Sequence, residues 1–159
     1  IFSRSDGIIL DTFFVNDAQS GTLAKKEERE LFERILNEAL NQELDLSAVI
    51  ARRKTPPPLY LSVENEKLPT VVQFDNETSE TRTVIDVEAE DRVGLLYAIS
   101  QALSELSLDI SVAKIFTEKG AAIDSFYVAE LDGTKVNSPD RQRQVERRLR
   151  TAIAQLGKK

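Results

Sequence analysis

Residues 83–106 combine an alternating pattern with a helical one. Between 83 and 90, the apolar residues Ile85, Val87 and Ala89 alternate with acidic residues, which is typical of a strand with one buried face. After a short turn, apolar residues recur at spacings of three and four positions, which predicts an amphipathic helix. The apolar stripe of this predicted helix consists of Leu95, Leu96, Ile99, Ala102, Leu103 and Leu106.

The turn between this strand and this helix is the first candidate site. Asp91 lies where an N-cap residue would accept hydrogen bonds from the first backbone N–H groups of the helix. Gly94 has no Cβ, so another group can approach its backbone closely. The free N–H groups of a first helical turn are also suited to binding a carboxylate.

The chain contains an internal repeat. The string D-T-F-F-V at 11–15 aligns with D-S-F-Y-V at 124–128, and I-F-S at 1–3 aligns with I-F-T at 115–117. Each pair of strings brackets a turn that contains glycine, which predicts two hairpins. A polar loop and a predicted helix follow each hairpin, so the two halves of the chain are built alike.

The repeat predicts two units of the same fold. The other predicted elements are helices at 25–43, 44–53 and from Pro139 onward, and strands at 70–75, 110–117 and 122–131. The pattern is that of βαββαβ units, an α+β fold of the ferredoxin-like kind with an antiparallel sheet and helices on one face. We assign residues 1–80 to a truncated first unit with its linker, and 81–159 to a second unit. The first unit lacks its opening strand and helix, which we expect upstream of Ile1 in a longer protein.

Composition narrows the possible functions. The 159 residues carry a formal net charge of −6, which argues against nucleic acid or an anionic membrane as the main partner. The sequence contains no histidine and no cysteine, which excludes Ser-His triads, histidine bases, thiolate nucleophiles and zinc sites built on these ligands. The lack of cysteine suits a cytoplasmic protein. Any catalysis would have to use carboxylates, lysine or a hard metal ion; we expect no catalytic residues in this chain.

Several segments together resemble a known family. The strings E-A-E-D-R-V-G-L-L-Y-A-I at 88–99 and L-D-I-S-V-A-K-I-F-T at 108–117, followed by D-S-F-Y-V, resemble an ACT domain. Two further segments indicate which ACT-containing proteins the chain resembles. They are the string F-D-N-E-T-S-E-T-R-T-V-I-D-V at 74–87 and the hairpin at 1–15. They are similar to the C-terminal tandem ACT region of bacterial PII uridylyltransferase/uridylyl-removing enzymes.

The resemblance implies a regulatory role. ACT domains usually bind an amino acid where two of them meet, and in this family glutamine shifts the enzyme from uridylylating PII to removing the uridylyl group. The nucleotidyltransferase and metal-dependent hydrolase cores are absent from this chain, so Mg²⁺ is expected for the longer enzyme and no cofactor for these residues. Val93 departs from the family, in which proline commonly follows the Asp-Arg pair; valine lacks the preset φ angle of proline.

The resemblance also implies a ligand site. The turn would hold the polar ends of the effector with backbone groups, against a strand of a neighbouring ACT unit. The site residues that this implies are Asp91, Arg92, Val93, Gly94 and Leu95 in the turn, and Asp109, Ile110, Ser111 and Val112 on the strand. In the alternative, Asp91 only caps the helix and Gly94 only packs it against the sheet.

Three further groups of charged residues favour structural roles. Asp11 and Asp124 occupy the same place in the two hairpins, and we expect each on the outer face of its sheet rather than in a carboxylate pair. The acidic segment 75–77 predicts a turn rather than a metal site. The arginines of the last helix predict a solvated helix face; they are Arg141, Arg143, Arg147, Arg148 and Arg150.

Two functions stay open at this stage. In the first, the chain is an amino-acid sensor, with glutamine as effector and PII as the partner of the longer enzyme. In the second, it is an assembly module in which strand edges and open sheet faces pair with another ACT domain or a second chain. An ACT-only sensor of another amino acid is a variant of the first. Neither reading involves nucleic acid or a membrane.

Overall fold

The computed structural model describes residues 2–3, 8–10, 12, 16–17, 20–52, 68–118 and 120–156. The chain forms two compact units. The larger contains Ile1–Asp11 and Thr55–Lys159, and the smaller contains Thr12–Lys54.

The larger unit contains an antiparallel sheet. Its strands are β1 (Phe2–Ser3), β2 (Ile9–Leu10), β3 (Val71–Asp75), β4 (Thr83–Glu90), β5 (Leu108–Glu118) and β6 (Ala121–Glu130). Their order across the sheet is β2-β1-β5-β6-β4-β3. The first hairpin therefore joins the second, because Phe2 of β1 pairs with Val112 of β5. The α+β, ferredoxin-like fold predicted from the sequence is confirmed.

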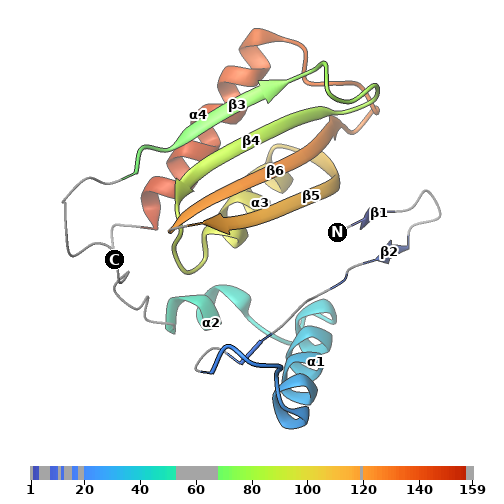
Figure 1. Ribbon diagram of the computed structural model, residues 1–159. Helices are drawn as coiled ribbons and strands as arrows, with labels where there is room; N and C mark the ends of the chain where they lie inside the picture. The colour runs from blue at the N-terminus through green and yellow to red at the C-terminus, as the bar shows by residue number, and fades with distance from the viewer. Residues whose placement is uncertain are drawn as a thin grey trace. The chain divides into compact units, whose positions relative to one another are not determined.

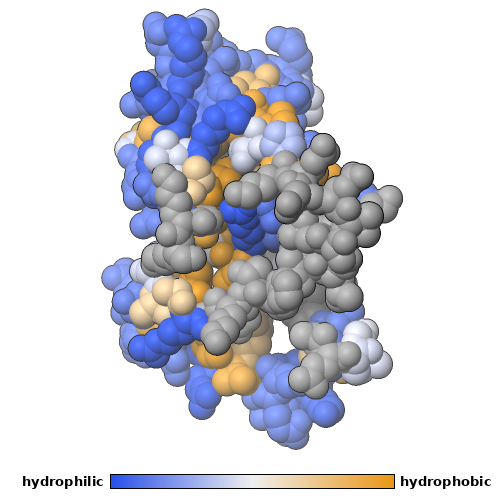
Figure 2. Space-filling model, turned by 90° about the vertical axis from the view of Figure 1, so that its left-hand side faces the viewer, coloured by the Kyte–Doolittle hydropathy of each residue, from blue (hydrophilic) through white to orange (hydrophobic). Residues whose placement is uncertain are grey.

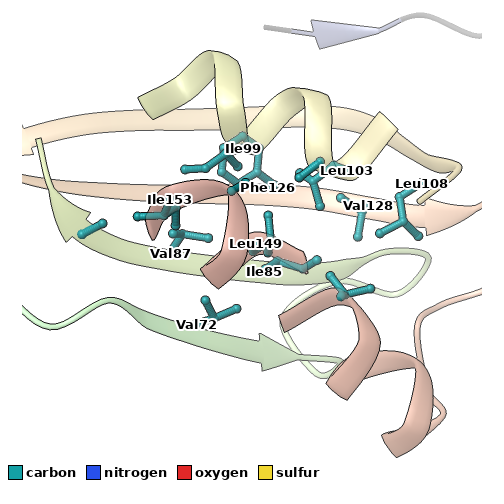
Figure 3. Packing of buried hydrophobic residues seen from close by; sticks show 14 of the residues in the cluster. Val72, Ile85, Val87, Ile99, Leu103, Leu108, Phe126, Val128, Leu149 and Ile153 are labelled. Carbon is teal, nitrogen blue, oxygen red and sulfur yellow. The ribbon is translucent and has the colours of Figure 1, made fainter. Parts of the chain in front are cut away.

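Two helices cover one face of the four strands β3–β6 (Figure 1). They are α3 (Leu95–Glu105) and α4 (Pro139–Gln155). Most of the predicted apolar residues of both helices point into the core, where Ile99 of α3 and Leu149 of α4 meet Phe126 of β6 (Figure 3). Since burial of such a side chain is worth about 1.5–3 kcal/mol, this layer is the main source of stability of the unit. Leu96, which we expected in the stripe of α3, is 40% exposed, because it lies one position beside the buried face of the helix.

Strand β3 lies beside β4 rather than in a sheet of the first repeat. We expected residues 70–75 to end the first unit, but Val71 pairs with Glu88 and Asp75 with Val84. The physical reason is local, because a tight turn after Asp75 folds the chain back along the free edge of β4. Val72 is buried in the shared core as a result. The division of the chain at residue 80 stays a prediction.

A buried polar network holds the start of α4 on the sheet. Thr83 Oγ1 donates to Asn76 Oδ1 at 2.5 Å and accepts from the backbone N–H of Val136 at 2.8 Å. Asn76 Nδ2 also donates to the carbonyl of Val136 at 3.3 Å. Because Thr83 is fully buried, these bonds replace the water that its hydroxyl loses on folding.

The smaller unit contains α1 (Lys26–Leu40) and α2 (Leu46–Arg52), at the positions predicted for helices. No residue of either helix is buried. Their ends are held by local bonds: Glu28 Oε2 accepts from the N–H of Lys25 at 2.7 Å, and Asp45 Oδ1 accepts from the N–H of Ala48 at 3.1 Å. None of the helices that the structure describes is long and apolar enough to cross a membrane.

Candidate functional site

The turn between β4 and α3 is hydrogen-bonded to the turn between β5 and β6. The backbone N–H of Asp91 donates to the carbonyl of Gly120 at 2.8 Å, and the N–H of Leu95 donates to the carbonyl of Arg92 at 3.0 Å. Gly94 has a φ of 86°, in the left-handed region that glycine adopts without strain. We refer to residues 91–95 as the β4–α3 loop.

Gly94, and not Asp91, is the N-cap residue of α3. The expected capping role of Asp91 is therefore wrong, because the chain makes a further turn before the helix begins. The cap position has no side-chain hydrogen bond. The first N–H groups of an α-helix lack intrahelical partners, so those of α3 that follow Leu95, whose N–H is bonded to Arg92, are suited to an anion.

The one arginine of the β4–α3 loop is already paired. The guanidinium of Arg92 donates to the carboxylate of Glu90, and both side chains are largely buried. Since this ion pair neutralises Arg92, a ligand carboxylate at the loop would depend on backbone N–H groups rather than on a free guanidinium.

The other predicted site residues lie on β5. Asp109 forms an ion pair with Arg82 at 2.8 Å, and Ser111 Oγ donates to the carbonyl of Tyr127 at 3.2 Å. The pairing of β5 with β6 is irregular between Ile110 and Val112, which is a β-bulge at Ser111. Bulges redirect side chains and are common beside binding sites.

The β4–α3 loop and the β5 residues lie at opposite ends of the sheet. Glu90, next to the loop, pairs with Ala121, whereas Asp109 pairs with Ala129. At about 3.4 Å per residue along β6, the two groups are separated by roughly 20 Å or more. They do not meet within this unit, so a site that uses both requires a second unit. That arrangement stays a prediction.

Asp124 is buried, contrary to the sequence-based expectation. Only 2% of its surface is exposed, and it lies on the helix-covered face of β6 between Ala122 and Phe126. Burial raises the pKa of its carboxyl, and the charge of Asp91 raises it further, against a lowering by the N–H of Phe116. The signal was present in the sequence, because Asp124 shares the period-two phase of Phe126 and Val128. Asp11 lies outside the described residues.

The remaining charged groups have structural partners. Asp75 accepts from the N–H groups of Glu77 and Thr78, which confirms the predicted turn. Among the residues that the structure describes, no three His, Cys, Asp or Glu side chains gather as a metal site.

On α4 the arginines pair mostly with acidic neighbours, and the surface over this helix in Figure 2 is largely hydrophilic. The ion pairs are Arg143 with Asp140, Arg148 with Glu105, Arg150 with Glu146 and Arg141 with Glu130. The solvated helix face predicted from the sequence fits these pairs.

Comparison with known proteins identifies the family. Residues 71–156 match the family described as an ACR9-like, ACT-like domain. A bifunctional uridylyltransferase/uridylyl-removing enzyme of Azospirillum brasilense is 37% identical over 159 residues, covering 97% of this chain and 16% of that protein. Proteins of the same name are 32% identical in Rhodospirillum rubrum (98% and 16% covered) and in Ruegeria pomeroyi (97% and 16% covered).

The chain thus spans about 16% of the length of these relatives. No solved structure matches it. The family match extends from β3 to α4 and covers more than half of the chain. On this ground the chain belongs to the ACT-like domain family.

Proposed function

We propose that this chain is a regulatory module that binds a small amino acid, glutamine in the first place. Through it, a longer enzyme would switch between uridylylating the PII nitrogen-regulatory protein and removing the uridylyl group. The relatives named above, whose names describe both reactions, support this role. The chain itself would supply neither catalysis nor a cofactor, and we place it in the cytoplasm.

One observation carries the binding part of the proposal. The β4–α3 loop brings a left-handed glycine and the first turn of α3, whose cap position has no side-chain hydrogen bond, to one end of the sheet. A backbone without side chains can approach a small ligand closely, and the helix end favours its carboxylate. Asp91 of the loop is hydrogen-bonded to Gly120 in the β5–β6 turn, so ligand binding at the loop would be transmitted to this end of the sheet.

The regulatory part follows from linkage. An effector changes a distant activity only if it binds one conformation of the enzyme more tightly than the other, and typical coupling is about 1–3 kcal/mol. A module that binds glutamine across two ACT units would favour the arrangement in which both halves of the site meet.

Calorimetric titration tests the proposal directly. We expect saturable binding of L-glutamine by the 159-residue chain, with L-glutamate, L-asparagine and L-serine binding more weakly. Gly94→Val should abolish binding, because a side chain at this φ is strained and fills the loop. Gly133→Val is the matched control: Gly133 has a φ of 84° in the turn after β6, so it suffers the same strain of about 1–2 kcal/mol without touching the loop.

Two outcomes would contradict the proposal. If no amino acid binds to the wild-type chain, the sensing function is wrong. If Gly94→Val and Gly133→Val bind glutamine equally well, the site is elsewhere.

The assembly module is the second candidate. Phe116 and Ile123 are paired across β5 and β6 and are exposed by 57% and 42%. Ile123 belongs to the face of β6 away from the helices. Exposed apolar pairs of this kind favour contact with another protein surface. In that case the unfolding temperature would depend on protein concentration and not on any amino acid.

A further inference from the structure

The carboxyl of Asp124 lies beneath the first turn of α3. Figure 3 shows Phe126 beside Ile99 and Val128 near Leu103, so β6 and α3 run in the same direction. Asp124 precedes Phe126 by two positions on the same face of β6, and Leu95 precedes Ile99 by one helical turn. The Asp124 carboxyl therefore faces the layer in which the β4–α3 loop lies.

This carboxyl has little to compensate its burial. Asp124 Oδ1 accepts one long hydrogen bond, from the backbone N–H of Phe116 at 3.4 Å. Among the described residues no ion pair is formed by Asp124, and the guanidinium of Arg92 in the loop is paired with Glu90. An acid buried in this way is costly unless a cation or strong donors balance it.

The described neighbours of Asp124 are mainly apolar, and one charged neighbour is negative. Val87 of β4 and Ile115 of β5 are its cross-strand neighbours, and Leu95 opens the helix above it. Asp91 of the loop adds a second negative charge close enough to act on Asp124. Among these described neighbours, none supplies a positive charge to the carboxyl.

The internal repeat carries a second acid at the same place. Asp11 aligns with Asp124, within the string I-I-L-D-T-F-F-V that matches A-A-I-D-S-F-Y-V. A role that both repeats share would explain this match.

We propose that the Asp124 carboxylate receives the ammonium group of the amino-acid effector, while the N–H groups at the start of α3 receive its carboxylate. The two groups match the two opposite charges of a zwitterion. This inference rests on the proposed function and specifies its ligand: an amino acid with a free α-ammonium group. Because Asp124 is only 2% exposed, the β4–α3 loop must shift to admit the ligand, which couples binding to a change in the loop.

A ligand without the amino group tests the inference. The wild-type chain is titrated with L-glutamine and with glutaramic acid, which is glutamine without its α-amino group. A charge-assisted hydrogen bond is worth about 1.5–3 kcal/mol, so glutamine should bind roughly 10- to 100-fold more tightly. In Asp124→Asn, this preference should fall to near unity, because glutamine loses affinity and glutaramic acid does not.

The matched control is Asp86→Asn. The Asp86 carboxylate lies on the neighbouring strand, where it accepts from Ser125 Oγ at 2.5 Å, and Ser125 is adjacent to Asp124 in sequence but faces the other side of the sheet. This variant should keep the wild-type preference for glutamine. Thermal unfolding of both variants shows whether the fold is intact.

The titrations distinguish failure of the inference from failure of the proposed function. Wild-type preference retained in Asp124→Asn would overturn the inference and leave the proposed function standing. Failure of the wild-type chain to bind any amino acid would remove both. If Asp124→Asn does not fold, the ¹³Cγ resonance of Asp124 in the wild-type chain decides. Saturating glutamine should lower the pKa read from this resonance, and an unchanged pKa would overturn the inference.

Discussion

Helices α4 and α1 occupy equivalent places in the internal repeat but differ in burial. When the alignment of Asp11 with Asp124 is continued without a gap, the apolar stripes of the two helices coincide. The stripe of α4 is buried and comprises Val145, Leu149, Ala152 and Ile153. The matching positions of α1 are Phe32, Leu36, Ala39 and Leu40, and none of them is buried.

The difference shows that an amphipathic pattern specifies a helix but not its burial. Both stripes have the spacing of a core-facing helix. Only α4 lies in the unit that contains a sheet of several strands, and the network around Thr83 fixes its start there. Helix α1 relies on local bonds at its N-terminus. The predictions below test this contrast, beginning with the largest effect.

Replacing the matched leucines of the two helices by alanine should give the largest difference in lost stability. Leu149→Ala removes a fully buried side chain and should destabilise the larger unit by about 2–5 kcal/mol. Leu36→Ala removes a partly exposed side chain and should cost roughly 1 kcal/mol or less. Urea unfolding followed by circular dichroism measures both. Equal losses would mean that the α1 stripe is as well packed as that of α4.

The buried network around Thr83 should have the next largest effect. Thr83→Val keeps the shape of the side chain but leaves the N–H of Val136 without its acceptor, at a cost of about 1–3 kcal/mol. Glu28→Ala, which removes the local bond at the start of α1, should cost roughly 0.5–1 kcal/mol. Hydrogen exchange should show faster exchange of the first amides of α4 in Thr83→Val. Unchanged protection there would exclude the network as the anchor of this helix.

Asp124 in the larger unit and Asp45 in the smaller unit should also differ in the sign of their contribution to stability as the pH changes. The folded-state pKa of Asp124 is raised above 3.8, mainly by burial, so its contribution favours folding at acidic pH and is lost as the pH rises through that raised pKa. The pKa of Asp45 is lowered below 3.8, first by the N–H of Ala48. Its contribution is present above 3.8 and is lost as the pH falls through the lowered value.

Asparagine variants make this contrast measurable. In Asp124→Asn, the stability of the larger unit at pH 7 should rise relative to wild type, and the gain should shrink toward pH 4. Asp45→Asn should instead lower the stability of the smaller unit above pH 3.8, and this loss should shrink as the pH falls through the lowered pKa of Asp45. Amide exchange in α4 and in α2, measured from pH 7 down to below pH 3.8, follows the two units separately. The same trend in both variants would contradict the assigned environments.

Much of the fold could be predicted because it depends on local patterns. The stripe of α3, the alternation along β4 and the Ser-Pro start of α4 each follow from spacing within a few residues. The partner of β3 could not be predicted in this way. Its spacing indicates a strand but not the strand edge that it joins; the turn after Asp75 and the burial of Val72 in the core of the larger unit decide that edge.

The candidate site was predicted in part for the same reason. The glycine of the β4–α3 loop stands out in sequence because only glycine readily adopts its φ. The ion pair between Arg92 and Glu90 depends on side-chain directions that no spacing rule specifies. Because of this pair, only backbone groups of the loop are available to bind a ligand carboxylate. The burial of Asp124 was indicated by its phase along β6, but its polar character favoured the opposite interpretation.

The sequence alone determined the repeat, the elements and the family resemblance of this chain, since each is set by residue order over short distances. The tertiary structure decided which of two similar helices is buried, which edge receives β3 and which acid lies beneath α3. These depend on contacts between residues far apart in the chain, such as Thr83 with Val136 and Asp91 with Gly120. Such contacts form only when the whole sheet provides their surroundings.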